Sequence, residues 1–151
     1  MMPNLFSEFI ELLEKHEVRY LIVGGYAVAA HGYPRFTGDI DLFVAISPAQ
    51  AKGIVKAFQE FGFTDLDISE EDFLSEDMIV EIGREPNKIQ VMTGISGVTF
   101  EECYTSRVEF ESGGKPRPFI AFEQLIKNKR ATKRGKDLVD VEELVKRKTH
   151  S

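Results

Sequence analysis

Residues 20–41 of the 151-residue chain read YLIVGGYAVAAHGYPRFTGDID, and most of the information on the fold lies here. A short apolar strand is predicted over 19–23, and the pair Gly24-Gly25 ends it. An alanine-rich helix is expected over 26–31, and a second strand follows over 39–45 with the sequence DIDLFVA. Strand, glycine pair, short helix and strand therefore follow one another within fewer than thirty residues.

The second strand carries two carboxylates at alternate positions. Side chains two apart on a strand share a face, so Asp39 and Asp41 point the same way, while Ile40, Leu42 and Val44 enter the core. Two aspartates ~7 Å apart along a strand repel each other unless a cation lies between them. The pattern favours a Mg²⁺ site, because this hard cation takes oxygen ligands and bridges to phosphates. A strand with a polar, solvent-facing side is the alternative.

The residues before this strand suit phosphate binding. A Gly-Gly pair such as Gly24-Gly25 lets the backbone approach a phosphate closely. Arg35 presents a planar fork of donors that can clamp phosphate oxygens. The alternatives are an ordinary tight turn for the glycines and a surface ion pair for the arginine.

The rest of the chain mixes helices with paired strands. Ser47 and Pro48 begin a helix that ends at Gly62. Residues 65–77 hold seven carboxylates and predict an exposed loop with one helical turn. The other predicted helices span 3–17, 100–104, 122–131 and 135–147, and the other strands span 78–82, 88–92, 107–111 and 118–121. This order predicts an α/β or α+β fold with a mixed sheet flanked by helices.

Composition and charge narrow the class of protein. Residues 1–151 suit one domain, with 42% hydrophobic and 29% charged residues and one cysteine. The net charge of -6 argues against a general polyanion binder. Basic helices are nevertheless predicted from about 122 onward, and nine basic and four acidic residues follow position 126. No apolar run approaches the ~20 residues that cross a bilayer, so no membrane contact and a cytoplasmic location are expected.

The order of Gly24-Gly25, Arg35, Asp39 and Asp41 resembles the polymerase-β-like nucleotidyltransferase superfamily. More narrowly, the chain is similar to small bacterial and archaeal nucleotidyltransferase-like proteins related to the toxins of abortive-infection toxin–antitoxin systems. The likeness extends over about residues 15–145, and includes 20–28, 83–100 and 123–140. It implies the nucleotidyltransferase fold.

The resemblance also implies an activity. Asp39 and Asp41 would hold Mg²⁺ and act as the catalytic pair, and a nucleotide would pass from a nucleoside triphosphate to an acceptor, with release of pyrophosphate. RNA, a protein and a small molecule all remain open as the acceptor, and an antitoxin or a second copy as the partner. The implied nucleotide-binding residues are Gly24, Gly25, Arg35, Thr37, Lys129 and Arg130.

One position departs from the family pattern. Gln90 stands where active members carry a third carboxylate, and its neutral amide can neither offset a second metal nor act as a base. If Gly83 pairs with Lys88, Glu81 lies opposite Gln90 and could supply the missing carboxylate; a plain surface role for Glu81 is the alternative. A degenerate nucleotide-binding or toxin–antitoxin interaction module, without catalysis, is therefore the alternative to an enzyme.

Overall fold

The computed structural model describes residues 2–63 and 68–149. Its helices are α1 (Asn4–Lys15), α2 (Gly24–Ala30), α3 (Pro48–Phe61), the 3-10 turn η1 (Glu70–Leu74), α4 (Phe100–Thr105), α5 (Phe122–Thr132) and α6 (Gly135–Thr149). Its strands are β1 (Tyr20–Val23), β2 (Ile40–Val44), β3 (Ile79–Ile82), β4 (Ile89–Met92), β5 (Val108–Ser112) and β6 (Lys115–Phe119).

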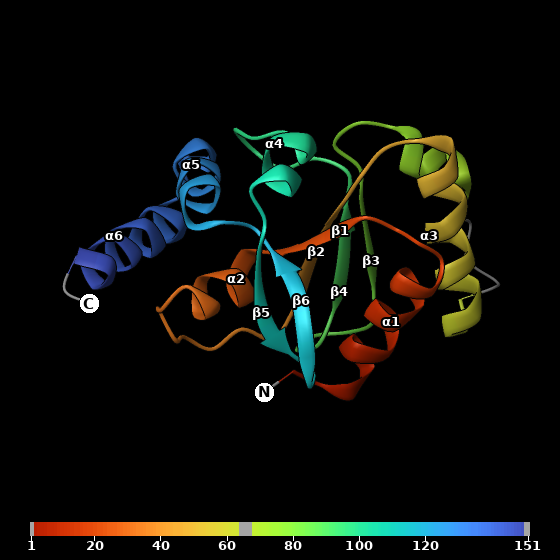
Figure 1. The fold of residues 1–151 in the computed structure, drawn as a ribbon, viewed down its shortest axis with the longest axis horizontal. Coiled ribbons are helices and arrows are strands. Elements are labelled where there is room, and N and C mark those ends of the chain that lie inside the picture. Colours follow the sequence, from red (N-terminus) through yellow and green to blue (C-terminus); the bar gives the residue numbers. More distant parts are fainter. Residues whose placement is uncertain (1, 64–67, 150–151) are drawn as a thin grey trace.

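The strands form one six-stranded sheet in the order β3-β4-β2-β1-β6-β5 (Figure 1). β2 pairs antiparallel with β1 and parallel with β4, and β6 is parallel to β1. The hairpins β3–β4 and β5–β6 are antiparallel. The predicted mixed sheet flanked by helices is confirmed.

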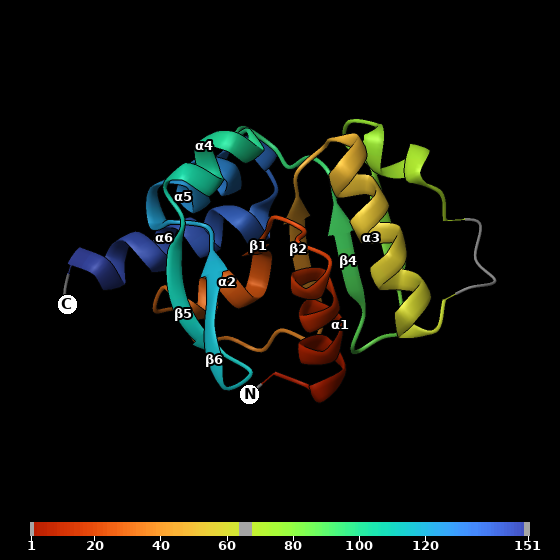
Figure 2. The ribbon, with the colours of Figure 1, turned by 45° about the vertical axis from the view of Figure 1, so that its right-hand side comes forward.

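Both faces of β2 are covered. Ile40 and Leu42 are fully buried, and their face of the sheet lies toward α1, because Tyr20 on the same face donates its hydroxyl hydrogen to Glu14 of α1. α1 and α3 lie side by side (Figure 2). On the other face Phe43 packs edge-on against Phe100 of α4, with ring centroids 5.2 Å apart. The open, solvent-facing strand is therefore excluded.

Two elements begin earlier than predicted. α2 starts at Gly24, since the positive φ of 66° at this residue turns the chain directly from β1 into the helix. β6 starts at Lys115, three residues before the predicted strand, and pairs with β5 from there. Pro116 and Pro118 have no N–H to donate, which explains why β6 meets β1 at the single pair of Phe119 with Ile22.

The helix that was predicted from its N-terminal cap and its C-terminal glycine is confirmed. The Ser47 hydroxyl accepts the Gln50 N–H at 3.2 Å, and α3 ends at Gly62 in the left-handed conformation, as predicted. The acidic segment 65–77 includes residues outside the described part of the chain. Its described part does contain one helical turn, and Phe73 of this turn is buried and stacks on Phe58 of α3. The described helices include none with the length and apolar content needed to cross a membrane.

Candidate functional site

Asp39 and Asp41 lie where β2 begins. Asp39 precedes the strand, and its Oδ1 accepts the backbone N–H of Lys88 at 2.8 Å. The pKa of Asp41 is raised to about 6, chiefly because the side chain is buried; Lys129 opposes this rise and the nearby Asp39 charge adds to it. The Oδ1 atom of Asp41 is buried and has no hydrogen-bond partner among the described residues. Such an atom is costly unless a ligand supplies the missing interaction.

The glycine pair lies directly against side chains that follow it in the sequence, at positions 35–41. A methyl group at Gly24 would collide with Oδ2 of Asp41, and one at Gly25 would collide with the hydroxyl of Thr37. The same position above Gly25 lies 3.6 Å from Nη1 of Arg35. The missing side chains therefore let a carboxylate, a hydroxyl and a guanidinium converge on the first turn of α2.

A row of polar side chains crosses three strands. Asp41 is in register with Gln90 on β4, and Gln90 is in register with Glu81 on β3, so the predicted pairing of Glu81 with Gln90 is confirmed. Glu81 lies at the exposed edge of the sheet, and its Oε2 accepts the ammonium of Lys88 at 2.7 Å. A hydrogen bond from Lys88, and a second one from Gln90 with a smaller effect, lower the pKa of Glu81. Gln90 therefore separates Glu81 from Asp41 by one strand.

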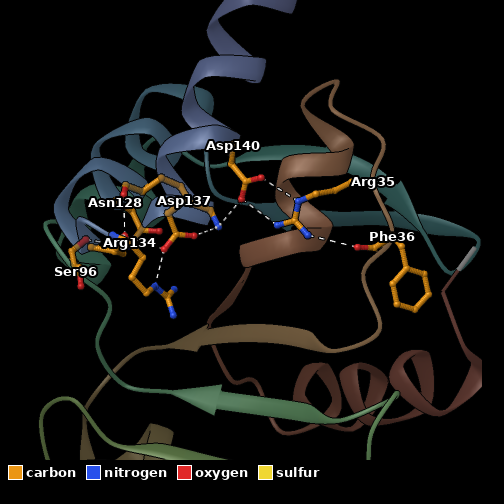
Figure 3. A network of polar contacts seen from close by, with 9 residues as sticks. Arg35, Phe36, Ser96, Asn128, Arg134, Asp137 and Asp140 are labelled. Carbon is orange, nitrogen blue, oxygen red and sulfur yellow. Dashed lines mark hydrogen bonds and ion pairs between the residues drawn. The ribbon is translucent and has the colours of Figure 1, made fainter.

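Arg35 and Lys129 are joined through Asp140, a buried aspartate of α6, and Lys129 also contacts the buried Asp137 of the same helix. Arg35 donates Nε and Nη2 to the two oxygens of Asp140, each at 3.0 Å (Figure 3). Lys129 Nζ lies 2.8 Å from Asp137 and 3.1 Å from Asp140. The neighbouring Arg130 is exposed, and no described contact joins it to this network. The structure thus brings Arg35 and Lys129 together and leaves Arg130 apart.

Positive charge from the C-terminal helices reaches Asp41. Lys129, Lys136 and Arg134 each lower its pKa, although burial outweighs them. Three residues of the basic C-terminal helices therefore lie close enough to Asp41 to act on its charge. Asp137 completes this region, because its carboxylate accepts hydrogen bonds from Lys129, Thr132 and Arg134. Burial alone would raise the pKa of Asp137, but these hydrogen bonds lower it to about 2.

Sequence reasoning missed Asp137 and Asp140. The signal was present, because these residues and the apolar pair Val141 and Leu144 follow the i, i+3, i+4, i+7 spacing of one buried helix face. Acidic residues at core positions of a helix require cations opposite them.

A cavity of about 990 Å³ is lined in part by Tyr26, which follows the glycine pair, and by Thr37, which lies against Gly25. One wall of this cavity is formed by Tyr26, Arg35 and Thr37. The pKa of Tyr26 is raised mainly by burial and additionally by the negative charge of Asp39. α1 and the β5–β6 hairpin form the opposite walls, which include the carboxylates of Glu8, Glu11 and Glu111. The volume suits a small ligand or one side chain of a larger one.

The donor set fits one Mg²⁺ ion that takes further ligands from a substrate. Among residues 2–63 and 68–149 no cluster of three or more His, Cys, Asp or Glu side chains is arranged to hold a metal. Mg²⁺ commonly takes one or two carboxylates, with phosphate oxygens and water completing its shell. Asp39 and Asp41, with the unpartnered Oδ1 of Asp41, meet that requirement.

Two other reactive side chains are structural. The imidazole of His31 contacts the carbonyl oxygen of Ile120 at 2.8 Å and packs edge-on against Phe110 and Phe122. Cys103 is buried, and burial raises the pKa of its thiol to about 12. Neither lies in a position to act at the Asp39–Asp41 pair.

No protein-family model and no curated protein matches the chain. The crystal structure of a "putative nucleotidyltransferase" from Thermotoga maritima is similar to it, with a TM-score of 0.58 and 18% sequence identity. The match covers 98% of this chain and 92% of that protein. The chain therefore has a nucleotidyltransferase-like fold along nearly its whole length.

Proposed function

We propose that this chain is a Mg²⁺-dependent nucleotidyltransferase that transfers a nucleotide from a nucleoside triphosphate to an acceptor. The observation that carries the proposal is the convergence of Asp41, with its unpartnered Oδ1, on Gly24 at the start of α2. Asp39 and Asp41 would hold Mg²⁺, which when bound neutralises phosphate charge and polarises the phosphorus under attack.

The other residues have distinct roles in this proposal. Gly24 and Gly25 carry no side chain that would block phosphate oxygens, Thr37 and Arg35 lie beside Gly25, and Lys129 is joined to Arg35 through Asp140. In the proposal these three side chains bind the triphosphate. The acceptor oxygen attacks the α-phosphorus, the bond to the β-phosphate oxygen breaks and pyrophosphate leaves. The acceptor proton passes to water or to the carboxylate of Glu81, because the amide of Gln90 cannot take it.

The cavity beside Arg35 and Thr37 is the place proposed for the acceptor. Tyr26 also lines this cavity, which has room for a small molecule or for one residue of a protein or RNA. An antitoxin or a second copy as partner, and a cytoplasmic location, stay predictions.

A specific observation favours a second candidate, a nucleotide-binding module without catalysis. Gln90 occupies the position next to Asp41 on the neighbouring strand, and Glu81 beyond it is engaged with Lys88. A second metal would therefore find less negative charge here than two-metal transfer requires. Such a module would bind a triphosphate with Mg²⁺ and release no pyrophosphate.

Calorimetry and a pyrophosphate assay separate the two candidates. Each nucleoside triphosphate is titrated with and without Mg²⁺, and pyrophosphate is followed over time with RNA, protein or small-molecule acceptors. Mg²⁺-dependent binding with turnover supports the enzyme, and binding without turnover supports the module. Equal triphosphate binding with and without Mg²⁺ contradicts both, whereas RNA binding that survives loss of both Asp39 and Asp41 supports a nucleic-acid-binding protein without catalysis.

A further inference from the structure

Asp140 is the point at which two cations of the site meet, the buried Lys129 and the partly exposed Arg35. Its carboxylate receives two bonds from Arg35 at 3.0 Å, and Lys129 Nζ lies 3.1 Å from its Oδ2. The side chain of Asp140 is 5% exposed. Arg35 comes from the segment between α2 and β2, whereas Lys129 comes from α5. One carboxylate on α6 therefore sets the position of cations from two other parts of the chain.

The bidentate contact also fixes which edge of Arg35 stays available. Asp140 takes the edge formed by Nε and Nη2 and leaves Nη1, whose one hydrogen bond within the described part of the chain is a long 3.4 Å contact with the carbonyl oxygen of Phe36. Nη1 lies 3.6 Å from the position of a methyl group at Gly25. Figure 3 shows Asp140 on one side of the guanidinium and Phe36 on the other. The remaining donors are therefore held toward the glycine pair.

We infer that Asp140 is a positioning residue for triphosphate binding, acting through Arg35 and Lys129. The inference rests on the proposed function and names a residue that the sequence motif does not contain. Arg35 is 32% exposed, so a phosphate can reach its open edge while Asp140 holds the opposite one. A guanidinium held in this way loses less conformational freedom on binding phosphate than an unrestrained one.

Removing the charge of Asp140 distinguishes this role from two simpler ones. If Asp140 only neutralises part of the positive charge of the site, the Asp140→Asn variant has a more positive site and binds phosphate more tightly. If Asp140 only holds α6 in place, the variant melts at a lower temperature and its affinity for phosphate is unchanged. Positioning alone predicts weaker binding despite the gain in positive charge.

The test measures the affinity of Asp140→Asn for ATP and for inorganic tripolyphosphate by calorimetry in Mg²⁺. We expect both affinities to fall about tenfold, the size of one charge-assisted hydrogen bond. Asp140→Glu, which keeps the charge, should recover part of the loss. Glu143→Gln on the same helix is the matched control, because Glu143 pairs with Arg147 of α6, and it should bind like the wild type. Unchanged or tighter binding by a folded Asp140→Asn protein overturns the inference.

Arg35→Lys provides a second route if Asp140→Asn does not fold. Lysine keeps the charge but cannot make the bidentate contact with Asp140, so the same loss of affinity is expected. Wild-type affinity in Arg35→Lys overturns the inference. Failure of the wild type to bind either probe with Mg²⁺ contradicts the proposed function instead, so the two failures are distinguishable.

Discussion

Asp41 and Asp137 are both removed from bulk water, yet their surroundings are opposite. Asp41 has a buried oxygen with no hydrogen-bond partner in the described chain, and burial raises its pKa to about 6. Asp137 accepts bonds from Lys129, Thr132 and Arg134, and its pKa falls to about 2. A buried carboxylate that the fold satisfies stabilises the fold. One that the fold leaves unsatisfied is available to a ligand.

The largest effect is expected at Asp137. Asp137→Asn leaves Lys129 and Arg134 with less compensating charge, and removal of one partner from a buried ion pair costs ~3–5 kcal/mol of unfolding free energy. Because the folded pKa of Asp137 is depressed, its contribution is present above about pH 4 and is lost as the pH falls toward 2. Urea unfolding at several pH values measures both effects. A loss below ~1 kcal/mol would show that the network is not a structural tether.

A gain in stability is expected at Asp41. The folded pKa of Asp41 is raised, so its ionised form destabilises the fold increasingly as the pH rises from about 4 to about 6. Asp41→Asn should therefore raise the unfolding free energy at pH 8 by ~1–3 kcal/mol and leave it little changed at pH 4. Mg²⁺-dependent triphosphate binding should be lost in the same variant. A large drop in melting temperature would identify Asp41 as a structural residue and contradict the site.

A smaller cost is expected at the glycine pair. Gly25→Val places side-chain atoms where the Thr37 hydroxyl lies, so we expect a loss of ~1–3 kcal/mol and no triphosphate binding. Gly135→Ala is the matched control, because a methyl group there meets nothing within 4 Å. Thermal melts and calorimetry measure the two quantities. Wild-type affinity in a folded Gly25→Val protein would remove the phosphate-binding role of this turn.

The smallest effect on stability is expected at the edge of the sheet. Glu81 and Lys88 form a partly exposed pair, and such pairs contribute ~0–1 kcal/mol, so Glu81→Gln should unfold close to the wild type. Measurements of pyrophosphate release distinguish the possible roles of Glu81 and Gln90. Gln90→Asp should raise pyrophosphate release if the neutral amide limits catalysis. If Glu81 already serves, Glu81→Gln removes turnover and Gln90→Asp changes little. Robust turnover that survives Glu81→Gln would contradict both ideas.

Much of the fold could be read from local signals. The Ser47 cap, the proline at 48 and the glycine at 62 predicted α3 correctly, and hairpin spacing predicted the register of Glu81 opposite Gln90. The starts of α2 and β6 were predicted too late. A positive-φ glycine continued into the helix at Gly24, and prolines were accommodated in β6 because it pairs little with β1.

The candidate site divides in the same way. Asp39, Asp41 and the glycine pair lie within eighteen residues of one another, so a motif and the alternation of a strand suffice to propose them. Asp140 lies 105 residues from Arg35, and no local pattern couples the two. Sequence order carries local conformation and side-chain periodicity, because these depend on neighbours along the chain. Tertiary packing decided which buried charges meet, since desolvation and ion pairing depend on what approaches from elsewhere in the molecule. It is this packing that paired Lys129 with Asp137 and left Oδ1 of Asp41 without a partner in the described structure.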